Sequence, residues 1–370
     1  MKKYKLTAML LSLALIMSMV LTACGSKSDD EQTGNNGSNN ASTGNEVWEQ
    51  TFEADGNEYP SMTIGLATMG NMNDIAATPG CQGFALFKNY MEGKSGGKIK
   101  VEIYDNSVLG SDEDMLEQVA QNSVQITCPM TSGLLTYDAE FGALDLPFLF
   151  ASSDQAITAM NGEVGEYFKS TLDSSTGLTI AGYYYNGARS MTNNVRPITC
   201  VDDMKGLKMR VMNSDTYVKL MQALGANPTP ISWNELFTAM QQGTVDGEEN
   251  PPSTIYPSGF AEVQKYFSKT EHVFGYAAVV VSSAFYNGMD DASRKLFDEG
   301  IELLTSTADK AELELGDAYI AKMAEAGMEC NDITPENKQG FIDATASVRD
   351  EYRSVYSAEL WGILDKVTAN

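Results

Sequence analysis

The chain is poor in cationic side chains. It has 25 Lys and Arg residues against 50 Asp and Glu residues, so its formal net charge at pH 7 is −25. Nucleic-acid binding needs a basic patch or stripe that contacts phosphates, and the sequence contains no such stripe. We therefore expect no nucleic-acid partner and an acidic surface that mainly favours solubility. An anionic ligand would need a local cationic pocket.

Histidine and closely spaced cysteines are also scarce. His272 is the only histidine, and no two cysteines have the CxxC spacing, so the sequence supports neither a zinc site nor any other cofactor. Beyond Cys24 near the N-terminus, three complete disulfide pairings and buried free thiols all remain open. The residues concerned are Cys81, Cys128, Cys200 and Cys330.

The N-terminal segment has the pattern of a cleaved leader. Residues 2–5 are mostly basic, residues 6–20 are mostly apolar, and Leu21, Thr22 and Ala23 precede Cys24. This ending resembles a bacterial lipobox, which implies a lipoprotein signal peptide over residues 1–23, cleavage before Cys24 and acylation of its thiol outside the cytoplasmic membrane. The alternative is an uncleaved membrane anchor of marginal length. Residues 24–46 then form a lipidated, flexible linker that is too polar to build a core.

The remaining chain has an α/β pattern. Its length of 370 residues exceeds the usual size of a single core, so two lobes are expected. Periodicity predicts strands at residues 62–68, 98–104, 124–128, 178–185 and 279–282. It predicts helices at residues 81–94 and 112–121, the second capped by Ser111, and a helical region from residue 292 with a turn near 327–335.

Residues 204–252 are the most informative part of the chain. Apolar side chains alternate with polar ones over residues 207–212, which predicts a strand that carries Arg210. Asn213, Ser214 and Asp215 are candidate caps for a helix over residues 216–224. An arginine beside the free N–H groups of a helix N-terminus is a place to hold an anion, and open α/β folds bind ligands at that edge.

The same order of elements then repeats. Residues 228–231 are predicted as a strand, and Ser232 with Glu235 as a capping box for a helix over residues 233–242, which Gly243 ends. Residues 245–250 are predicted as the next strand.

The segments KGLKMRV, LGANPTPIS and QGTVDGEENP, in this order, resemble the TRAP-type C4-dicarboxylate solute-binding family. Further agreement lies at residues 94–119, 144–150, 186–189 (NGAR) and 262–274, so the resemblance extends from about residue 62 to the C-terminus. It implies a two-lobe, periplasmic-binding-protein-like fold with crossovers between the lobes and a long C-terminal helix spanning both. Lobe one is expected at residues 60–186 with 276–315, and lobe two at 187–275 with 316–370.

The resemblance also implies two arginines at the ligand site. Arg210 matches the family's carboxylate clamp, and a guanidinium can give a carboxylate two parallel hydrogen bonds. Arg189, in NGAR, matches the second family arginine. The alternatives are an ordinary ion pair for Arg210 and a salt bridge between the lobes for Arg189.

Three further substrate-binding residues are inferred from the resemblance. Asn250 matches a family amide, and Trp233 corresponds to a family aromatic, although it could equally be a core residue. Met130 stands where the sialic-acid branch carries an acid, which argues against a sialic acid. Glu248 replaces a glutamine and is expected outside the pocket, because it would repel an anion.

The predicted function is therefore an extracytoplasmic, membrane-anchored solute-binding protein. It would capture a dicarboxylate, a keto acid or a sugar acid and deliver it to a TRAP permease. The alternatives are an extracytoplasmic enzyme acting on an acidic sugar, for which no nucleophile or metal motif is found, and a sensory protein that presents the same ligand to a receptor. The identity of the acid and the oligomeric state stay open.

Overall fold

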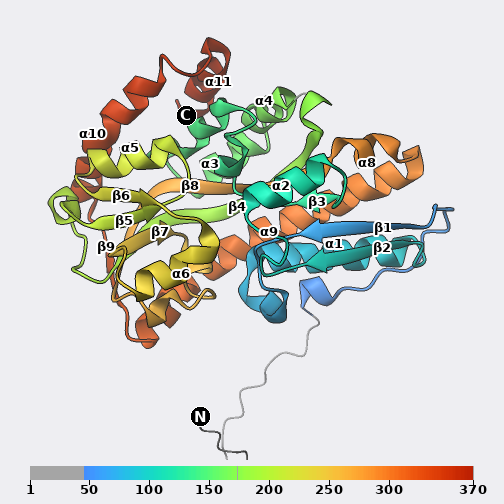
Figure 1. The fold of residues 1–370 in the computed structure, drawn as a ribbon, viewed down its shortest axis with the longest axis horizontal. Helices are drawn as coiled ribbons and strands as arrows, with labels where there is room; N and C mark the ends of the chain where they lie inside the picture. The colour runs from blue at the N-terminus through green and yellow to red at the C-terminus, as the bar shows by residue number, and fades with distance from the viewer. Residues whose placement is uncertain (1–45, 173, 370) are drawn as a thin grey trace, which may run out of the picture. The chain divides into compact units, whose positions relative to one another are not determined.

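The computed structural model describes residues 46–369 with the exception of residue 173. Within these residues, nine strands form one mixed sheet in the order β2-β1-β3-β8-β4-β7-β5-β6, with β9 paired to β8 (Figure 1). Helices cover both faces, which confirms the predicted α/β class. The predicted signal peptide and Cys24 lie outside the described residues.

The bounds of the elements are as follows. The strands are β1 (Met62–Ala67), β2 (Ile99–Tyr104), β3 (Ile126–Thr127), β4 (Leu178–Asn193), β5 (Lys208–Val211), β6 (Asn227–Pro230), β7 (Gly247–Asn250), β8 (Tyr266–Ser282) and β9 (Glu329–Asp332). The helices are α1 (Pro79–Lys94), α2 (Asp112–Ala120), α3 (Ser153–Met160), α4 (Glu163–Thr171), α5 (Asp215–Ala223), α6 (Trp233–Gln241), α7 (Pro252–Ile255), α8 (Ser283–Gly288), α9 (Asp291–Glu325), α10 (Pro335–Tyr352) and α11 (Ala358–Thr368).

Two long antiparallel strands, β4 and β8, form the middle of the sheet. Near one end of this pair, β3 pairs with β8, β1 pairs with β3 and β2 pairs with β1. Near the other end, β7 pairs with β4 and β9 pairs with β8. The register of β4 against β8 shifts at three points, and the middle shift lies between Tyr185 and Gly187, opposite Tyr276 and Gly275. This shift lies at the predicted lobe boundaries, which themselves stay a prediction.

The sequence predicts only the apolar halves of these two strands. β8 continues through Ser268, Thr270 and His272, which are all buried. Because polar side chains are buried among apolar ones in this part of β8, hydrophobic alternation does not reveal it. The predicted turn near residues 327–335 likewise contains the short strand β9, which pairs in parallel with the start of β8.

Ser111 and Ser232, which are both predicted as helix caps, differ in the hydrogen bonds that they form. Ser111 is the cap as predicted and also forms a capping box, since its side chain accepts from the Asp114 N–H while Asp114 accepts from the Ser111 N–H. The capping box predicted for Ser232 is wrong. Its hydroxyl donates to Glu235 Oε2 at 3.2 Å and makes no bond to the helix backbone.

The predicted long helix is α9, with 35 residues. Its N-terminal part packs against α1, and its C-terminal part contacts α7 and β9. The Tyr319 hydroxyl also donates to the Ala77 carbonyl oxygen at 2.7 Å. Residues 316–370 are predicted in lobe two, but α11 packs against α3 and α4, which belong to predicted lobe one. The C-terminal helices therefore contact parts of both predicted lobes.

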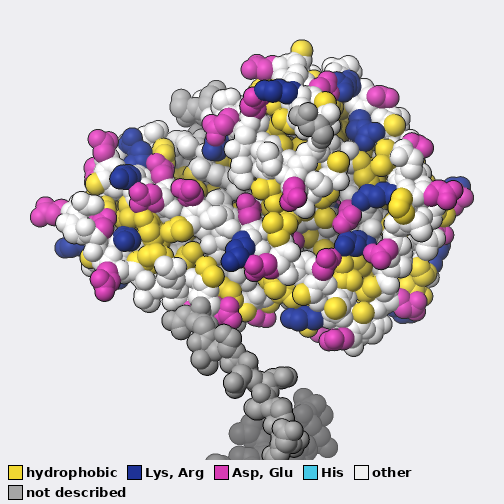
Figure 2. All heavy atoms as spheres, turned by 180° about the vertical axis from the view of Figure 1, so that it is seen from behind, with side chains coloured by type: hydrophobic (Ala, Val, Ile, Leu, Met, Phe, Trp, Pro, Cys, Tyr) yellow, Lys and Arg dark blue, Asp and Glu magenta, His cyan; other side chains and the backbone are white. Residues whose placement is uncertain are grey.

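The surface carries mixed charge. On the face shown in Figure 2, Lys and Arg side chains lie scattered among Asp and Glu side chains. Among the described helices, none combines the length and the apolar character needed to cross a bilayer.

The close approach of α1 and α9 gives a stability prediction. A Cβ on Gly83 would lie 2.5 Å from the Leu304 carbonyl oxygen, which belongs to rigid helix backbone. Gly83→Ala should therefore lower the free energy of unfolding by about 1–3 kcal/mol, measured by urea denaturation.

Gly316→Ala is the matched control in α9. A Cβ there meets no atom within 4 Å, so this change should raise stability by about 0.5–1 kcal/mol through helix propensity alone. Equal effects of the two substitutions would contradict the packing described.

Candidate functional site

A cavity of about 980 Å³ lies where several strand ends and helix starts meet. Its walls come from the starts of α1, α2, α6 and α7, the segments that follow β2, β3 and β5, and the middle of β4. These segments belong to both predicted lobes. The cavity has the size typical of small-molecule sites.

The structure brings four of the five predicted substrate-binding residues to this cavity. Arg210, Asn250, Trp233 and Met130 all line it, and Arg189 does not. Thr78 also lines the cavity, at the cap of α1.

Arg210 is the only residue with a cationic side chain among the described residues that line the cavity. It extends from β5 and is 3% exposed. Its Nε donates to the Ile231 carbonyl oxygen at 2.8 Å, and no other hydrogen bond joins its guanidinium to the described part of the chain. Burial lowers the pKa of Arg210, and the carboxyls of Glu249 and Glu248 oppose that shift. An arginine still stays protonated at neutral pH, so its terminal N–H groups remain available to an anion.

Trp233 and Met130 form apolar parts of the wall. Trp233 is half-buried at the start of α6, and its ring lies 5.5 Å from that of Phe260. It therefore faces the cavity and also packs on the core. Met130 is half-buried and follows β3, where it makes a bridge to Ala277.

Asn250 ends β7 and is buried. Its amide donates to Glu248 at 2.5 Å. Glu248 also accepts from the Thr192 hydroxyl and is absent from the cavity wall, as expected. Burial raises the pKa of Glu248 to about 7, although the bond from Asn250 opposes this.

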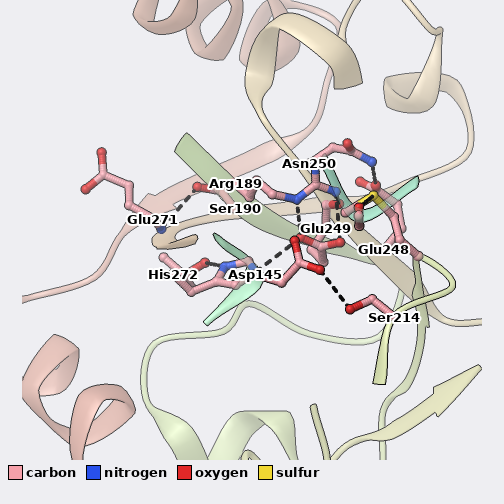
Figure 3. A network of polar contacts seen from close by, with 12 residues as sticks. Asp145, Arg189, Ser190, Ser214, Glu248, Glu249, Asn250, Glu271 and His272 are labelled. Carbon is pink, nitrogen blue, oxygen red and sulfur yellow. Dashed lines mark hydrogen bonds and ion pairs between the residues drawn. The ribbon is translucent and has the colours of Figure 1, made fainter. Parts of the chain in front are cut away.

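Arg189 lies behind the wall, in a buried ion pair with Glu249 (Figure 3). Its Nε donates to Glu249 Oε2 at 2.6 Å and its Nη2 to Oε1 at 2.9 Å, a two-point contact between β4 and β7. Nη2 also donates to the Glu249 carbonyl oxygen. The arrangement matches the alternative of a structural ion pair, and direct ligand contact by Arg189 stays a prediction.

His272 completes this network from β8. Its Nε2 lies 3.2 Å from Glu249 Oε2, and its Nδ1 lies 2.8 Å from the Thr270 hydroxyl. Burial alone would raise the pKa of Glu249, but the charges and hydrogen bonds of Arg189 and His272 together outweigh burial and hold the pKa at about 2. Glu249 therefore ties β4, β7 and β8 together as an ionised carboxylate.

Asp145 and Ser214 form a further buried contact of this region (Figure 3). The Ser214 hydroxyl, at the cap position of α5, donates to Asp145 Oδ2 at 2.8 Å instead of capping its own helix. Burial raises the pKa of Asp145 to about 7.

Three acids in the cavity wall, Asp112, Glu113 and Glu312, were missed by sequence reasoning. Asp112 lies in the first turn of α2 and Glu312 in the middle of α9. In the sequence, Asp112 looks like any acid in the first turn of a helix. Glu312 lies in a helix that contains many other acids. Only the tertiary fold distinguishes them from surface residues.

Tyr184 and Tyr185 also line the cavity, whereas Tyr183 does not. Successive side chains of a strand point to opposite faces, and these tyrosines alternate, since Tyr183 and Tyr185 pack in one core cluster and Tyr184 in another. Tyr184 packs edge-on against Phe84 of α1.

The described residues contain no group of three or more His, Cys, Asp or Glu side chains that could hold a metal ion. Cys81, Cys128, Cys200 and Cys330 are all free thiols in the structure.

The buried ion pair gives a prediction with a defined pH dependence. Glu249→Gln leaves Arg189 buried without a charged partner, so it should cost about 3–5 kcal/mol in urea unfolding at pH 7. The Glu249 pKa is lowered from 4.5 to about 2 on folding, so its contribution is complete above about pH 4.5. The difference between the two proteins should shrink as the pH falls from 4.5 towards 2.

Asp365→Asn is the control, because Asp365 pairs with Arg353 at the surface and its side chain is 52% exposed. It should change stability by no more than about 1 kcal/mol. A Glu249 variant as stable as this control would disprove the role given to the ion pair.

Comparison with known proteins identifies the family. The model of "Bacterial extracellular solute-binding protein, family 7" matches residues 71–355. The C4-dicarboxylate-binding periplasmic protein DctP of Rhodobacter capsulatus is 31% identical over 294 residues, which cover 79% of this chain and 88% of that protein. The 2,3-diketo-L-gulonate-binding periplasmic protein YiaO of Escherichia coli strain K12 is 28% identical over 267 residues, which cover 72% of this chain and 80% of that protein.

Solved structures agree. The sugar acid binding protein DctPAm from Advenella mimigardefordensis strain DPN7T, in complex with galactonate, has a TM-score of 0.79 at 28% identity and covers 84% of this chain and 99% of its own. A TRAP periplasmic solute binding protein from Shewanella oneidensis with bound succinate has a TM-score of 0.78 at 27% identity. The match covers 84% of this chain and 100% of that chain. These neighbours confirm the predicted two-lobe fold. The chain belongs to bacterial extracellular solute-binding protein family 7, as its resemblance to TRAP-type solute-binding proteins predicted.

Proposed function

We propose that the protein captures a small organic acid outside the cytoplasmic membrane, with the ligand carboxylate on Arg210, and delivers it to a TRAP permease. One observation carries the proposal: the sole cationic side chain among the described residues of the cavity wall has unoccupied guanidinium donors. The relatives support the ligand class, since their names or bound molecules are C4-dicarboxylates and sugar acids.

The surroundings of Arg210 favour recognition of a carboxylate. The Ile231 carbonyl oxygen holds Nε, which leaves the two terminal nitrogens to form parallel bonds to one carboxylate. Glu248 and Glu249 lie behind the wall and offset the charge of Arg210 without occupying its terminal donors. A ligand carboxylate therefore meets an oriented, largely desolvated guanidinium.

The other predicted residues take supporting roles. Trp233 and Met130 offer apolar surface to the ligand's carbon skeleton, and Asn250 can donate or accept beside Arg210. Arg189 positions another residue of the site. Its bond to Glu249 holds β7 against β4, and Asn250 lies at the end of β7. The role we infer is binding without turnover.

Closure of the two predicted lobes would complete the site. The cavity wall contains segments of residues 60–186 and of residues 187–275, joined through β4 and β8. A ligand that touches both parts shifts the equilibrium to the closed state, because it binds that state more strongly. We place the hinge at the register shift beside Gly187, which has a φ of +116°.

The N-terminal pattern supports a lipid anchor outside the cytoplasmic membrane. We propose that Cys24 carries lipid and that residues 25–46 tether the folded part to the membrane. Such a tether has a root-mean-square reach of roughly 25 Å, which is enough to move the protein beside the permease.

The test is substitution of Arg210, with a ligand found by thermal-shift screening of an organic-acid library. The melting temperature of the protein should rise as the ligand concentration increases above the dissociation constant. In calorimetry, Arg210→Lys should weaken binding of that acid at least about tenfold, because lysine lacks the two-point geometry, and Arg210→Ala should abolish it.

Arg353→Lys is the control, since Arg353 pairs with Asp365 at the surface. It should bind as the unaltered protein does, and circular dichroism should confirm that all variants are folded. Unchanged affinity in folded Arg210→Ala would refute the proposal.

A further inference from the structure

We propose that the cavity selects acids with one carboxylate and several hydroxyl groups, with Asp112 and Glu312 binding the hydroxyls. The inference rests on the proposed function, because it assumes that Arg210 takes the ligand carboxylate. It adds the substrate class and two binding residues to that site.

The charges of the cavity wall argue against a dicarboxylate. Arg210 can neutralise one carboxylate, and the described wall has no second cationic side chain; its acidic residues are Asp112, Glu113 and Glu312. A second ligand carboxylate would face these acids without a cation of its own. Burying an unpaired charge is costly, so the wall disfavours a ligand with two carboxylates.

Asp112 presents an open hydrogen-bonding position. Its Oδ1 is shielded from solvent and has no hydrogen-bond partner among the described residues. Arg210 lies close enough for its charge to act on Asp112. A ligand held by Arg210 would therefore bring its neighbouring atoms near this oxygen.

Glu312 reaches the cavity from α9. The side chain is 5% exposed, and its carboxyl packs against the backbone of Gly187, where a Cβ would lie 2.3 Å from Oε1. The glycine of NGAR therefore makes room for this carboxyl. Ser253 also lines the cavity and lies near Glu312. These groups provide a polar end distinct from Arg210.

Hydroxyl groups suit these two acids better than an ammonium group. Burial raises the pKa of both Asp112 and Glu312 to about 8, so each is mainly protonated at neutral pH. A protonated carboxyl donates one hydrogen bond and accepts others, as a hydroxyl does. An ammonium group has only donors and favours an ionised partner.

The test compares organic acids by calorimetry on the full folded protein. The hydroxylated acids are gluconate, galactonate, glucuronate and galacturonate. The reference acids have the same number of carbon atoms: hexanoate has no hydroxyls, adipate has a second carboxylate and 6-aminohexanoate has an ammonium group. At least one hydroxylated acid should bind tenfold or more tightly than every reference acid.

Glu312→Met and Asp112→Leu approximately keep side-chain size and remove the hydrogen-bonding groups. Each should weaken the best hydroxylated acid about tenfold and leave hexanoate binding unchanged. Glu314→Gln, at an exposed position of the same helix, is the control and should have no effect.

The outcomes separate this inference from the proposed function. The selection for hydroxyls would be overturned if adipate or 6-aminohexanoate bound as tightly as the sugar acids. It would also be overturned if both variants retained full sugar-acid affinity. Binding that still depends on Arg210 would leave the carboxylate site standing. If no acid of this panel or of the screening library bound, both proposals would fail.

Discussion

The buried ion pair between Arg189 and Glu249 is the interaction on which the site depends. Glu249 bonds the guanidinium at two points and also meets His272, so one carboxylate joins β4, β7 and β8 directly behind the cavity. Removing either partner would leave an uncompensated charge in the interior. Arg189 is neutralised there, and Arg210 is the single cationic side chain among the described residues of the cavity wall.

The two arginines thus have different surroundings although both are buried. Arg189 has a carboxylate within bonding distance, whereas Arg210 bonds only one backbone carbonyl among the described residues. A protein with a formal charge of −25 repels anions at long range, so it needs a cationic donor without a carboxylate partner at close range. The acids Asp112 and Glu312 then restrict which anions fit beside it.

Local parts of this arrangement could be predicted from the sequence. Alternation and caps predicted β5, α5 and α6, and with them the position of Arg210 at the end of a strand. The partner of Arg189 lies 60 residues away, and the extensions of β4 and β8 bury polar side chains, so periodicity shows neither. Asp112 and Glu312 are recognisable as cavity residues only from the tertiary fold, which brings α2, α9 and β5 to the same cavity.

A crystal structure of the protein with its bound organic acid tests the central claim most directly. The account predicts that the ligand carboxylate accepts two hydrogen bonds from Arg210, at roughly 2.7–2.9 Å, while Arg189 remains bonded to Glu249. A ligand carboxylate bound by Arg189 with Glu249 displaced, or one that makes no contact with Arg210, would contradict it.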